Sequence, residues 1–271
     1  MLKQRVLTAV ALLALLAAVL GSQSMIAFRL TLAVFFAAAC WESFRLLQIR
    51  FAFPLGAIGG VVLLLMLASP GRDWTSLALL CVLIWALRFV PALKLGLPAT
   101  EGVRGLLFAT VFFIALLGCF ISMAELLQRS PLLLVSAMAI VWAADIGAYF
   151  AGRAFGMRKL APTISPGKSW EGVLGGWLAV LALGAASSFS PSLEHSFAVV
   201  LQQRFGWALW FLLMSVLVAA SVIGDLFESL MKRRAGVKDS SQLLPGHGGV
   251  LDRIDALVPV MPLALLLAGR T

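Results

Sequence analysis

The sequence is poor in charge. Only 12% of its 271 residues are Asp, Glu, Lys or Arg, whereas 62% are hydrophobic and the mean hydropathy is +1.03. Soluble domains average about 25% charged and about 45–50% apolar residues. A soluble domain of this length would not need so much apolar surface, whereas a bundle that faces lipid does. The composition therefore indicates an integral membrane protein.

Cysteine is also scarce. The three cysteines are Cys40, Cys81 and Cys119, and they are widely spaced within or beside apolar segments. No pair has the spacing of metal ligands, and an odd number gives no disulfide framework. We expect all three to be buried as small hydrophobic side chains.

Two familiar patterns are missing. The sequence has no internal repeat of the kind found in many transporters. Gly167-Lys168-Ser169 matches the end of a P-loop, but Pro162 stands where the first glycine of that motif belongs, and no buried strand precedes it. The sequence therefore does not predict a P-loop nucleotide site.

Long apolar runs, by contrast, are abundant. Runs of about 17–25 residues are long enough to cross a bilayer as helices, and their unbroken apolar character excludes barrel strands, which alternate. We predict an all-α, polytopic transmembrane helical bundle of about nine spans, with residues 1–140 forming N-terminal spans and residues 141–271 forming a second part. The predicted spans are 6–21, 25–41, 52–69, 74–91, 105–123, 131–151, 172–190, 206–227 and 256–269.

The basic residues predict the orientation. The first apolar run follows Lys3 and Arg5, which also fits a signal peptide, but we favour an uncleaved span because the next run begins almost at once. With nine spans and a cytoplasmic N-terminus, 16 of the 21 Lys and Arg residues lie on the inner side and five on the outer side. The net charge of +9 therefore reflects the membrane topology and an affinity for anionic lipids or an anionic substrate, and it does not indicate nucleic acid binding.

Two polar loops interrupt the second part of the chain. One runs from Gly152 to Glu171 and the other from Glu228 to Asp255. Two predicted spans lie between them, so both loops emerge on the same, cytoplasmic side. Soluble nucleotides are found on that side.

Acidic residues stand at the apolar edges of the second loop. Asp225 ends a very apolar segment, with Glu228 and Ser229 on the same helix face at i+3 and i+4, and Asp252 and Asp255 precede the last span. Ionised groups near hydrocarbon are costly and are therefore functional candidates. Carboxylates that enter a membrane from one side need a cation between them, and hard oxygen ligands suit Mg²⁺. We predict Asp225, Asp252, Asp255 and Glu228 as the metal ligands.

Basic residues and glycines surround these acids. Such mixtures recur where phosphoryl oxygens are held, and glycines let the backbone approach a phosphate closely. The alternative is a solvated juxtamembrane loop with acids as counterions, but that does not explain acids at apolar edges. The predicted phosphate-binding and neighbouring residues of this loop are Lys232, Arg233, Lys238, Arg253, Ser229, His247, Gly248 and Gly249.

The first loop adds a second set of candidates. Asp145 is an intramembrane acid, and Tyr149 follows it by one helical turn. The loop beyond them offers cations and hydroxyl groups to a substrate. These residues are Arg153, Lys159, Lys168, Ser165 and Ser169.

The second loop resembles the signature of the phosphatidate cytidylyltransferases (CDP-diacylglycerol synthases). The resemblance is carried by Ser229-x-Met231-Lys232-Arg233-x₄-Lys238-Asp239-x₅-Pro245-Gly246-His247-Gly248-Gly249-x₂-Asp252-Arg253-x-Asp255, without a departure at a fixed position. Residues 145–172 are similar to a second block of the same family. The resemblance implies that CMP is transferred from CTP to phosphatidate, giving CDP-diacylglycerol and pyrophosphate in phospholipid biosynthesis.

The resemblance also implies roles and surroundings. Residues 141–271 would be the catalytic transmembrane domain, with Asp225, Asp252, Lys232, Arg233 and Lys238 as catalytic residues and a second cation, K⁺ or Mg²⁺, beside the first. The expected location is a bacterial cytoplasmic (inner) membrane with the site facing the cytoplasm. The expected partners are CTP, phosphatidate and membrane lipids, without nucleic acid, and a homodimer is compatible with this architecture.

Two other functions stay open at this point. A lipid or polyprenol kinase would share CTP, Mg²⁺ and a multi-span fold but would transfer the γ-phosphate. A transporter or channel would place acids near the bilayer midplane and in repeated halves, whereas these acids lie at one face and occur once. CTP labelled at the α-phosphorus separates the two enzymes, because only a cytidylyltransferase moves that label into lipid.

Overall fold

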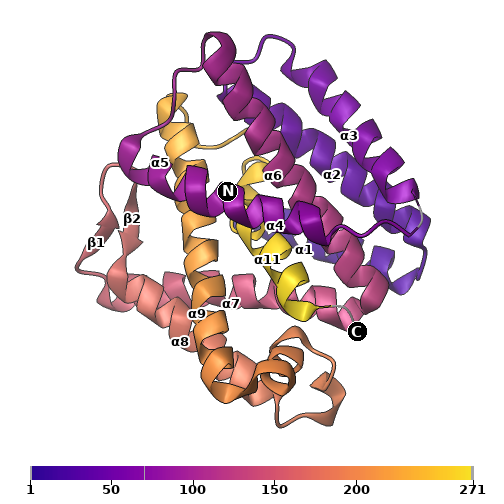
Figure 1. Cartoon of the computed structure of the whole chain (residues 1–271). Helices are drawn as coiled ribbons and strands as arrows, with labels where there is room; N and C mark the ends of the chain where they lie inside the picture. Colours follow the sequence, from indigo (N-terminus) through magenta and orange to yellow (C-terminus); the bar gives the residue numbers. More distant parts are fainter. Residues whose placement is uncertain (1, 70, 270–271) are drawn as a thin grey trace.

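The computed structural model describes residues 2–69 and 71–269, which are mostly helical (Figure 1). The helices of the first part are α1 (Leu2–Gly21), α2 (Met25–Leu46), α3 (Ala52–Ala68), α4 (Thr75–Ile84), the π-helical turn η1 (Trp85–Phe89), α5 (Val90–Leu95) and α6 (Gly102–Arg129). The second part contains α7 (Pro131–Phe155), strands β1 (Lys159–Ala161) and β2 (Ser165–Ser169), α8 (Trp170–Ser187), the 3₁₀ turn η2 (Pro191–Leu193), α9 (Phe197–Arg234), α10 (Leu251–Ile254) and α11 (Leu257–Ala268).

Six of the described helical segments are long and apolar enough to cross a membrane. They are Met25–Leu46, Thr75–Leu95, Gly102–Arg129, Pro131–Phe155, Trp170–Ser187 and Phe197–Arg234. Val6–Gly21 and Ala52–Ala68 are apolar but shorter, and α11 has 12 residues with Pro262 inside it. Each predicted span coincides with a helix, so a helical membrane protein is confirmed, while the count of nine crossings stays a prediction. One of the five basic residues predicted on the outer side, Arg270, lies outside the described residues.

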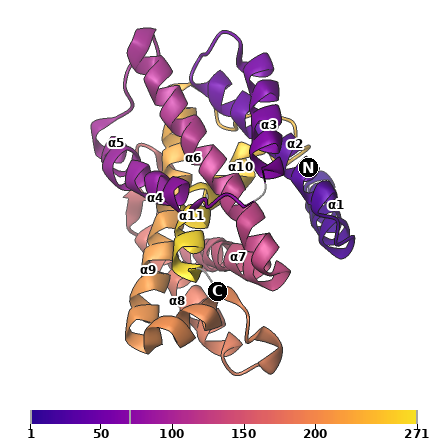
Figure 2. The same cartoon turned by 45° about the vertical axis from the view of Figure 1, so that its right-hand side comes forward.

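The helix α11 lies at the centre of the molecule. It packs against α4, α6, α7 and α9, and both views show it between α6 and α9 (Figures 1 and 2). Most of its side chains are buried, including Met261 and Ala264 at 0% exposure. A central position explains why a short helix with an internal proline is stable here, since its neighbours cover the backbone groups that the proline leaves free.

Aromatic side chains join the two parts of the chain. Phe227 of α9 is fully buried and packs against Trp85 and Phe89, with ring centroids 5.4 Å and 4.5 Å away, and against Phe112 of α6 at 5.6 Å. Such contacts between rings stabilise beyond the area they bury. This packing fixes the end of α9, where the acidic and basic residues of the second loop begin. The three cysteines are free and buried, as predicted.

The helices α7 and α8 cross closely through small residues. A Cβ atom added at Gly176 of α8 would lie 2.4 Å from the carbonyl oxygen of Ala144, and one added at Gly147 of α7 would lie 2.8 Å from that of Gly175. Small residues allow backbones in membrane proteins to approach in this way. The close crossing places Asp145 in one cavity with Gly172, Val173 and Gly176 of α8.

The polar loops are more regular than expected. Residues 159–169 form an antiparallel β-hairpin in which Lys159 pairs with Ser169 and Ala161 with Ser165. The helix α9 is broken at Gly206, where φ is +72°, and then continues to Arg234, seven residues beyond the predicted span. The ion pair of Lys232 with Glu228 one turn earlier stabilises this last stretch, and the helix ends just before Gly236, which has a φ of +71°.

Candidate active site

A cavity of about 360 Å³ lies among α7, α8, α9 and the hairpin. Its polar lining includes Asp145, Arg153, Lys168, Ser169 and Asp225. The rest of the lining is largely alanine, valine and glycine from the three helices. The structure therefore brings Arg153, Lys168 and Ser169 of the first loop into one cavity with Asp225, and apolar residues contribute much of its lining.

The hairpin and α9 are joined by an ion pair. The Nζ atom of Lys168 lies 2.5 Å from Oδ2 of Asp225, and the two side chains are 24% and 32% exposed. Ser229, one turn after Asp225, donates a hydrogen bond to its Oδ1 at 3.4 Å. Asp225, Glu228 and Ser229 thus share a helix face as the i+3 and i+4 spacing predicted, and the first loop contributes a cation to that face.

Lys232 lies between two acids of the second loop. Its Nζ atom is 2.6 Å from Oδ1 of Asp252 and also pairs with Oε2 of Glu228. The Glu228 carboxylate is almost fully buried, and its Oε1 atom has no hydrogen-bond partner among the described residues. The carboxylates of Glu228 and Asp252 therefore both contact the ammonium group of Lys232 at the end of α9.

Asp252 is held in place by the loop that precedes it. Its Oδ2 atom accepts hydrogen bonds from the backbone N–H groups of Ser240 at 2.8 Å and Gly249 at 2.7 Å, and the Ser240 hydroxyl lies at 2.8 Å. Burial alone would raise the pKa of Asp252, but the hydrogen bonds from Lys232, Gly249 and Ser240 outweigh it and lower the pKa below its usual value. Asp252 is therefore an anionic group with a fixed orientation.

Glycine is required at position 248 of this loop. Gly248 has a φ of +83°, and a Cβ atom there would lie 2.7 Å from Oδ2 of Asp252. Gly249, whose N–H contacts Asp252, is enclosed as well, with the Ser240 hydroxyl 2.1 Å from a Cβ position. These two glycines serve the geometry of Asp252 directly, and His247 beside them is half-buried.

Asp255 lies at the junction of α10 and α11. Its Oδ1 atom accepts the backbone N–H of Ala256 at 2.8 Å, and its carbonyl oxygen lies 2.4 Å from the position that a Cβ atom would take at Gly224 of α9. The junction thus packs directly beside the residue before Asp225.

Of the other predicted residues, Arg153 and Ser169 line the cavity with Asp225, and the rest lie outside its lining. Arg153 donates to the Tyr149 hydroxyl at 3.2 Å, and Arg233 donates from Nε to the carbonyl oxygen of Ile164 at 3.2 Å, which ties α9 to the hairpin. Ser169 is buried and accepts the N–H of Gly172 at 3.2 Å as the N-cap of α8. Lys159 and Arg253 are exposed, and Ser165 is half-buried.

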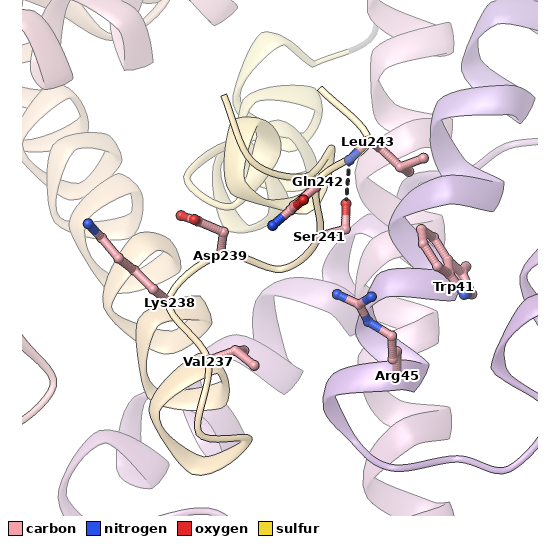
Figure 3. A pocket seen from close by; sticks show the side chains of 8 residues that line it. All are labelled: Trp41, Arg45, Val237, Lys238, Asp239, Ser241, Gln242 and Leu243. Atoms are coloured by element: carbon pink, nitrogen blue, oxygen red, sulfur yellow. Dashed lines mark hydrogen bonds between the residues drawn. The ribbon is translucent and has the colours of Figure 1, made fainter. Parts of the chain in front are cut away.

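Lys238 belongs to a separate cavity. That cavity, of about 590 Å³, lies between α2 and residues 237–243 (Figure 3). Arg45 and Trp41 extend into it from α2, with the guanidinium carbon of Arg45 5.2 Å from the centre of the Trp41 ring. The structure does not bring Lys238 into the cavity that contains Lys168 and Asp225.

The donor chemistry suits a hard divalent cation. Glu228, Asp252, Asp225 and Asp255 offer oxygen ligands only, and one buried oxygen of Glu228 lacks a hydrogen-bond partner among the residues described. The described part of the chain contains no group of three or more acidic, histidine or cysteine side chains already arranged around a metal position. In this structure the ammonium groups of Lys168 and Lys232 balance the acids instead.

Sequence reasoning missed one acidic residue that contacts the second loop. Glu42 of α2 is 0% exposed and accepts hydrogen bonds from residues 240–251. The signal that could have found it is a single carboxylate directly after the apolar run 25–41, because buried ionised groups require partners. The partners themselves are about 200 residues away, and no local pattern shows them.

Comparison with known proteins decides the family. The model of the cytidylyltransferase family matches residues 3–269. The chain belongs to this family. A protein of Pseudomonas aeruginosa named phosphatidate cytidylyltransferase is 41% identical over 281 aligned residues, which cover 99% of this chain and 98% of that protein. The resemblance found in the two loops is therefore confirmed over almost the whole chain.

Relatives from other bacteria carry the same name. A phosphatidate cytidylyltransferase of Haemophilus influenzae is 38% identical, with 97% of this chain and 96% of that protein covered. One of Bacillus subtilis is 31% identical, with 96% and 95% covered. The match includes the N-terminal helices as well as the two loops, so α2 lies within the region that the family model covers.

Proposed function

We propose that this protein transfers the cytidylyl group of CTP to phosphatidate, giving CDP-diacylglycerol and pyrophosphate. The observation that carries the proposal is the match over nearly the full length to relatives named for this activity. The geometry supports it, because the two motif segments meet through Lys168 and Asp225 at one end of the apolar helices.

The reaction asks little of a general base. An oxygen of the lipid phosphate attacks the α-phosphorus of CTP, a new P–O bond forms, and the bond to the bridging oxygen of the leaving pyrophosphate breaks. The attacking phosphate monoester is already anionic near neutral pH. The main demand is therefore to bring two polyanions together and to neutralise their charge, which positioned cations can do.

Lysine and arginine residues of this chain meet that demand. Lys168 and Lys232 stand beside acids in the interior of the site, and Arg233 holds the hairpin against α9. We assign Lys168 and Lys232 to phosphate oxygens, with Arg153 at the cavity mouth. The alanine and valine side chains that line the same cavity would face the lipid, whose tails then stay in the membrane.

We further propose Mg²⁺ as the cofactor, held by Asp225 and Asp252 with Asp255 and Glu228 beside them. Bound there, the ion would neutralise charge on the phosphate oxygens. Two observations support this proposal. The four side chains offer only oxygen ligands, and Glu228 and Asp252 already share one cation, the ammonium group of Lys232. A second cation, K⁺ or Mg²⁺, is part of the same proposal.

The orientation is also a proposal. The excess of basic residues on one side of the predicted topology supports a cytoplasmic N-terminus and an active site that faces the cytoplasm, in the inner membrane of a bacterium. A single cysteine introduced at exposed Lys159, in a variant without Cys40, Cys81 and Cys119, tests it. Labelling by an impermeant maleimide only after the inner membrane is opened supports a cytoplasmic hairpin, and labelling of intact spheroplasts contradicts it.

Product analysis tests the proposed reaction. Purified protein is incubated with CTP, Mg²⁺ and either phosphatidate or diacylglycerol, and the lipids are identified by mass spectrometry. We expect CDP-diacylglycerol and one pyrophosphate per product from phosphatidate, and no product from diacylglycerol. Phosphatidate formed from diacylglycerol would instead identify a lipid kinase, and no reaction with either lipid would contradict both enzymes.

A further inference from the structure

A buried acid of the N-terminal part holds the second loop. Glu42 in α2 accepts four hydrogen bonds: from the hydroxyl of Ser240 at 3.0 Å, from the hydroxyl of Ser241, and from the backbone N–H groups of Val250 at 3.0 Å and Leu251 at 2.7 Å. All four donors come from residues 240–251. Glu42 thus satisfies both ends of the loop segment that precedes α10.

These hydrogen bonds stabilise one position of residues 240–251 against α2 over all others. A buried carboxylate is costly unless charged hydrogen bonds compensate for the lost water. Both oxygens of Glu42 have two donors each, so a displacement of the loop would leave the charge poorly compensated. Glu42 therefore fixes where the loop lies against α2.

Arg45 supports the same contact from one helical turn further along α2. Its guanidinium donates to the carbonyl oxygen of Ser240 and stacks on Trp41. Figure 3 shows Arg45 directed from α2 toward the loop beside Ser241. One face of α2 thus holds Ser240 by its hydroxyl and by its backbone.

Ser240 connects Glu42 to Asp252. Its hydroxyl oxygen lies 3.0 Å from Glu42 Oε2 and 2.8 Å from Asp252 Oδ2, and its backbone N–H donates to the same Asp252 oxygen at 2.8 Å. The hydroxyl has a single proton, so it serves one carboxylate at a time, while the N–H serves Asp252 throughout. The residue that orients Asp252 is therefore itself oriented by Glu42.

We propose that Glu42 is a positioning residue of the active site: it holds Ser240 and the turn at residues 249–251, and through them it sets the position of the Asp252 carboxylate. This inference rests on the proposed function for its activity readout. It gives α2, which carries none of the motif residues, a defined part in the reaction.

The test is Glu42→Gln. The amide keeps the size of the side chain, but one of its two ends becomes a donor that faces the N–H of Val250 or Leu251, so the set of four hydrogen bonds cannot re-form. Loss of a partner that orients a site ligand costs about 10- to 100-fold in metal affinity or activity. We expect a decrease of that size in kcat and an increase in the Mg²⁺ concentration that gives half-maximal rate. A smaller folded fraction would lower the apparent kcat but would leave that Mg²⁺ concentration unchanged.

Hydrogen exchange gives a readout independent of activity. In the Glu42→Gln variant, peptides that contain residues 240–251 should exchange faster than in the wild type, while peptides from α6 and α11 should not change. Glu101→Gln is the matched control, because Glu101 is exposed and its side chain caps no helix N–H. The control should leave exchange, rate and Mg²⁺ dependence as in the wild type.

Ser240→Ala completes the test. It removes the hydroxyl between the two carboxylates, so it should shift the Mg²⁺ dependence in the same direction, and its effect should be smaller than additive when combined with Glu42→Gln.

If Glu42→Gln does not fold, Ser240→Ala decides: an unchanged Mg²⁺ dependence overturns the inference. Wild-type exchange and kinetics in a folded Glu42→Gln variant also overturn it. A wild-type protein without transferase activity would contradict the proposed function instead, and the exchange data would still decide whether Glu42 holds the loop.

Discussion

The Nζ atom of Lys168 lies 2.5 Å from Oδ2 of Asp225. These residues come from two loop regions that are separated by α8 and most of α9, and their ion pair joins both regions into one site. The hairpin carries Lys168 to this point, and the packing of Phe227 fixes the end of α9 that carries Asp225. The pair balances charge in the absence of substrate, and phosphate oxygens would compete with Asp225 for the lysine.

Replacement of Lys168 by glutamine should therefore impair catalysis more than folding. A lost donor to charge that develops in a transition state costs about 100- to 1,000-fold in rate. We expect a decrease of this order in kcat/KM, measured with CTP and phosphatidate in mixed micelles. Lys94→Gln is the control, since Lys94 is exposed at the end of α5. Equal activity of both variants would show that Lys168 is not part of the active site.

Replacement of Lys232 by methionine should affect stability as well. The side chains of Lys232, Glu228 and Asp252 are 12%, 2% and 4% exposed, so the change leaves two buried carboxylates without their shared cation. Removal of one partner of a buried ion pair costs about 3–5 kcal/mol. Equilibrium unfolding by dodecyl sulfate in mixed micelles measures the loss, and Glu228→Gln in the same chain should restore part of it. A loss no larger than that of Lys94→Met would show that the pair is not a structural element.

Gly248→Ala should abolish most of the activity, beyond what its backbone cost alone would cause. The new methyl group would meet Asp252 Oδ2, which lies 2.7 Å from the Cβ position, and would displace that carboxylate. Gly236→Ala is a matched control, because Gly236 has a similar φ of +71° and no neighbouring atom within 4 Å of its Cβ position. Both variants bear a backbone cost of about 1–2 kcal/mol. If both lose activity equally, backbone strain and not the position of Asp252 is the cause.

Gly176→Ala should loosen the crossing of α7 and α8. Its Cβ atom would lie 2.4 Å from the carbonyl oxygen of Ala144, so the helices must separate. Overpacking of this kind costs about 1–3 kcal/mol, and the thermal midpoint in detergent should fall. Gly21→Ala in α1, where nothing lies within 4 Å, should leave the midpoint unchanged. An unchanged midpoint for Gly176→Ala would mean that the close crossing adds nothing to stability.

The sequence predicts the helices well, because an apolar run long enough to cross a bilayer has few alternatives to a helix. It also places Asp225, Glu228 and Ser229 on one face, since their spacing follows the helical repeat. It does not predict the role of Glu42, whose partner Ser240 is 198 residues away. Neither does it predict that Lys238 lines a different cavity from Lys168, because that depends on how the loop folds against α2.

The fate of each phosphate of CTP tests the proposed reaction most directly. Purified wild-type protein is given phosphatidate, Mg²⁺ and CTP labelled at either the α- or the γ-phosphorus, and the lipid is extracted and counted. We predict label in the lipid from α-labelled CTP and in pyrophosphate from γ-labelled CTP, with both lost in Asp252→Asn. Lipid labelled from the γ-phosphorus, or no labelled lipid from either, would contradict cytidylyl transfer, and an Asp252→Asn variant with full activity would contradict the assignment of Asp252 as a metal ligand.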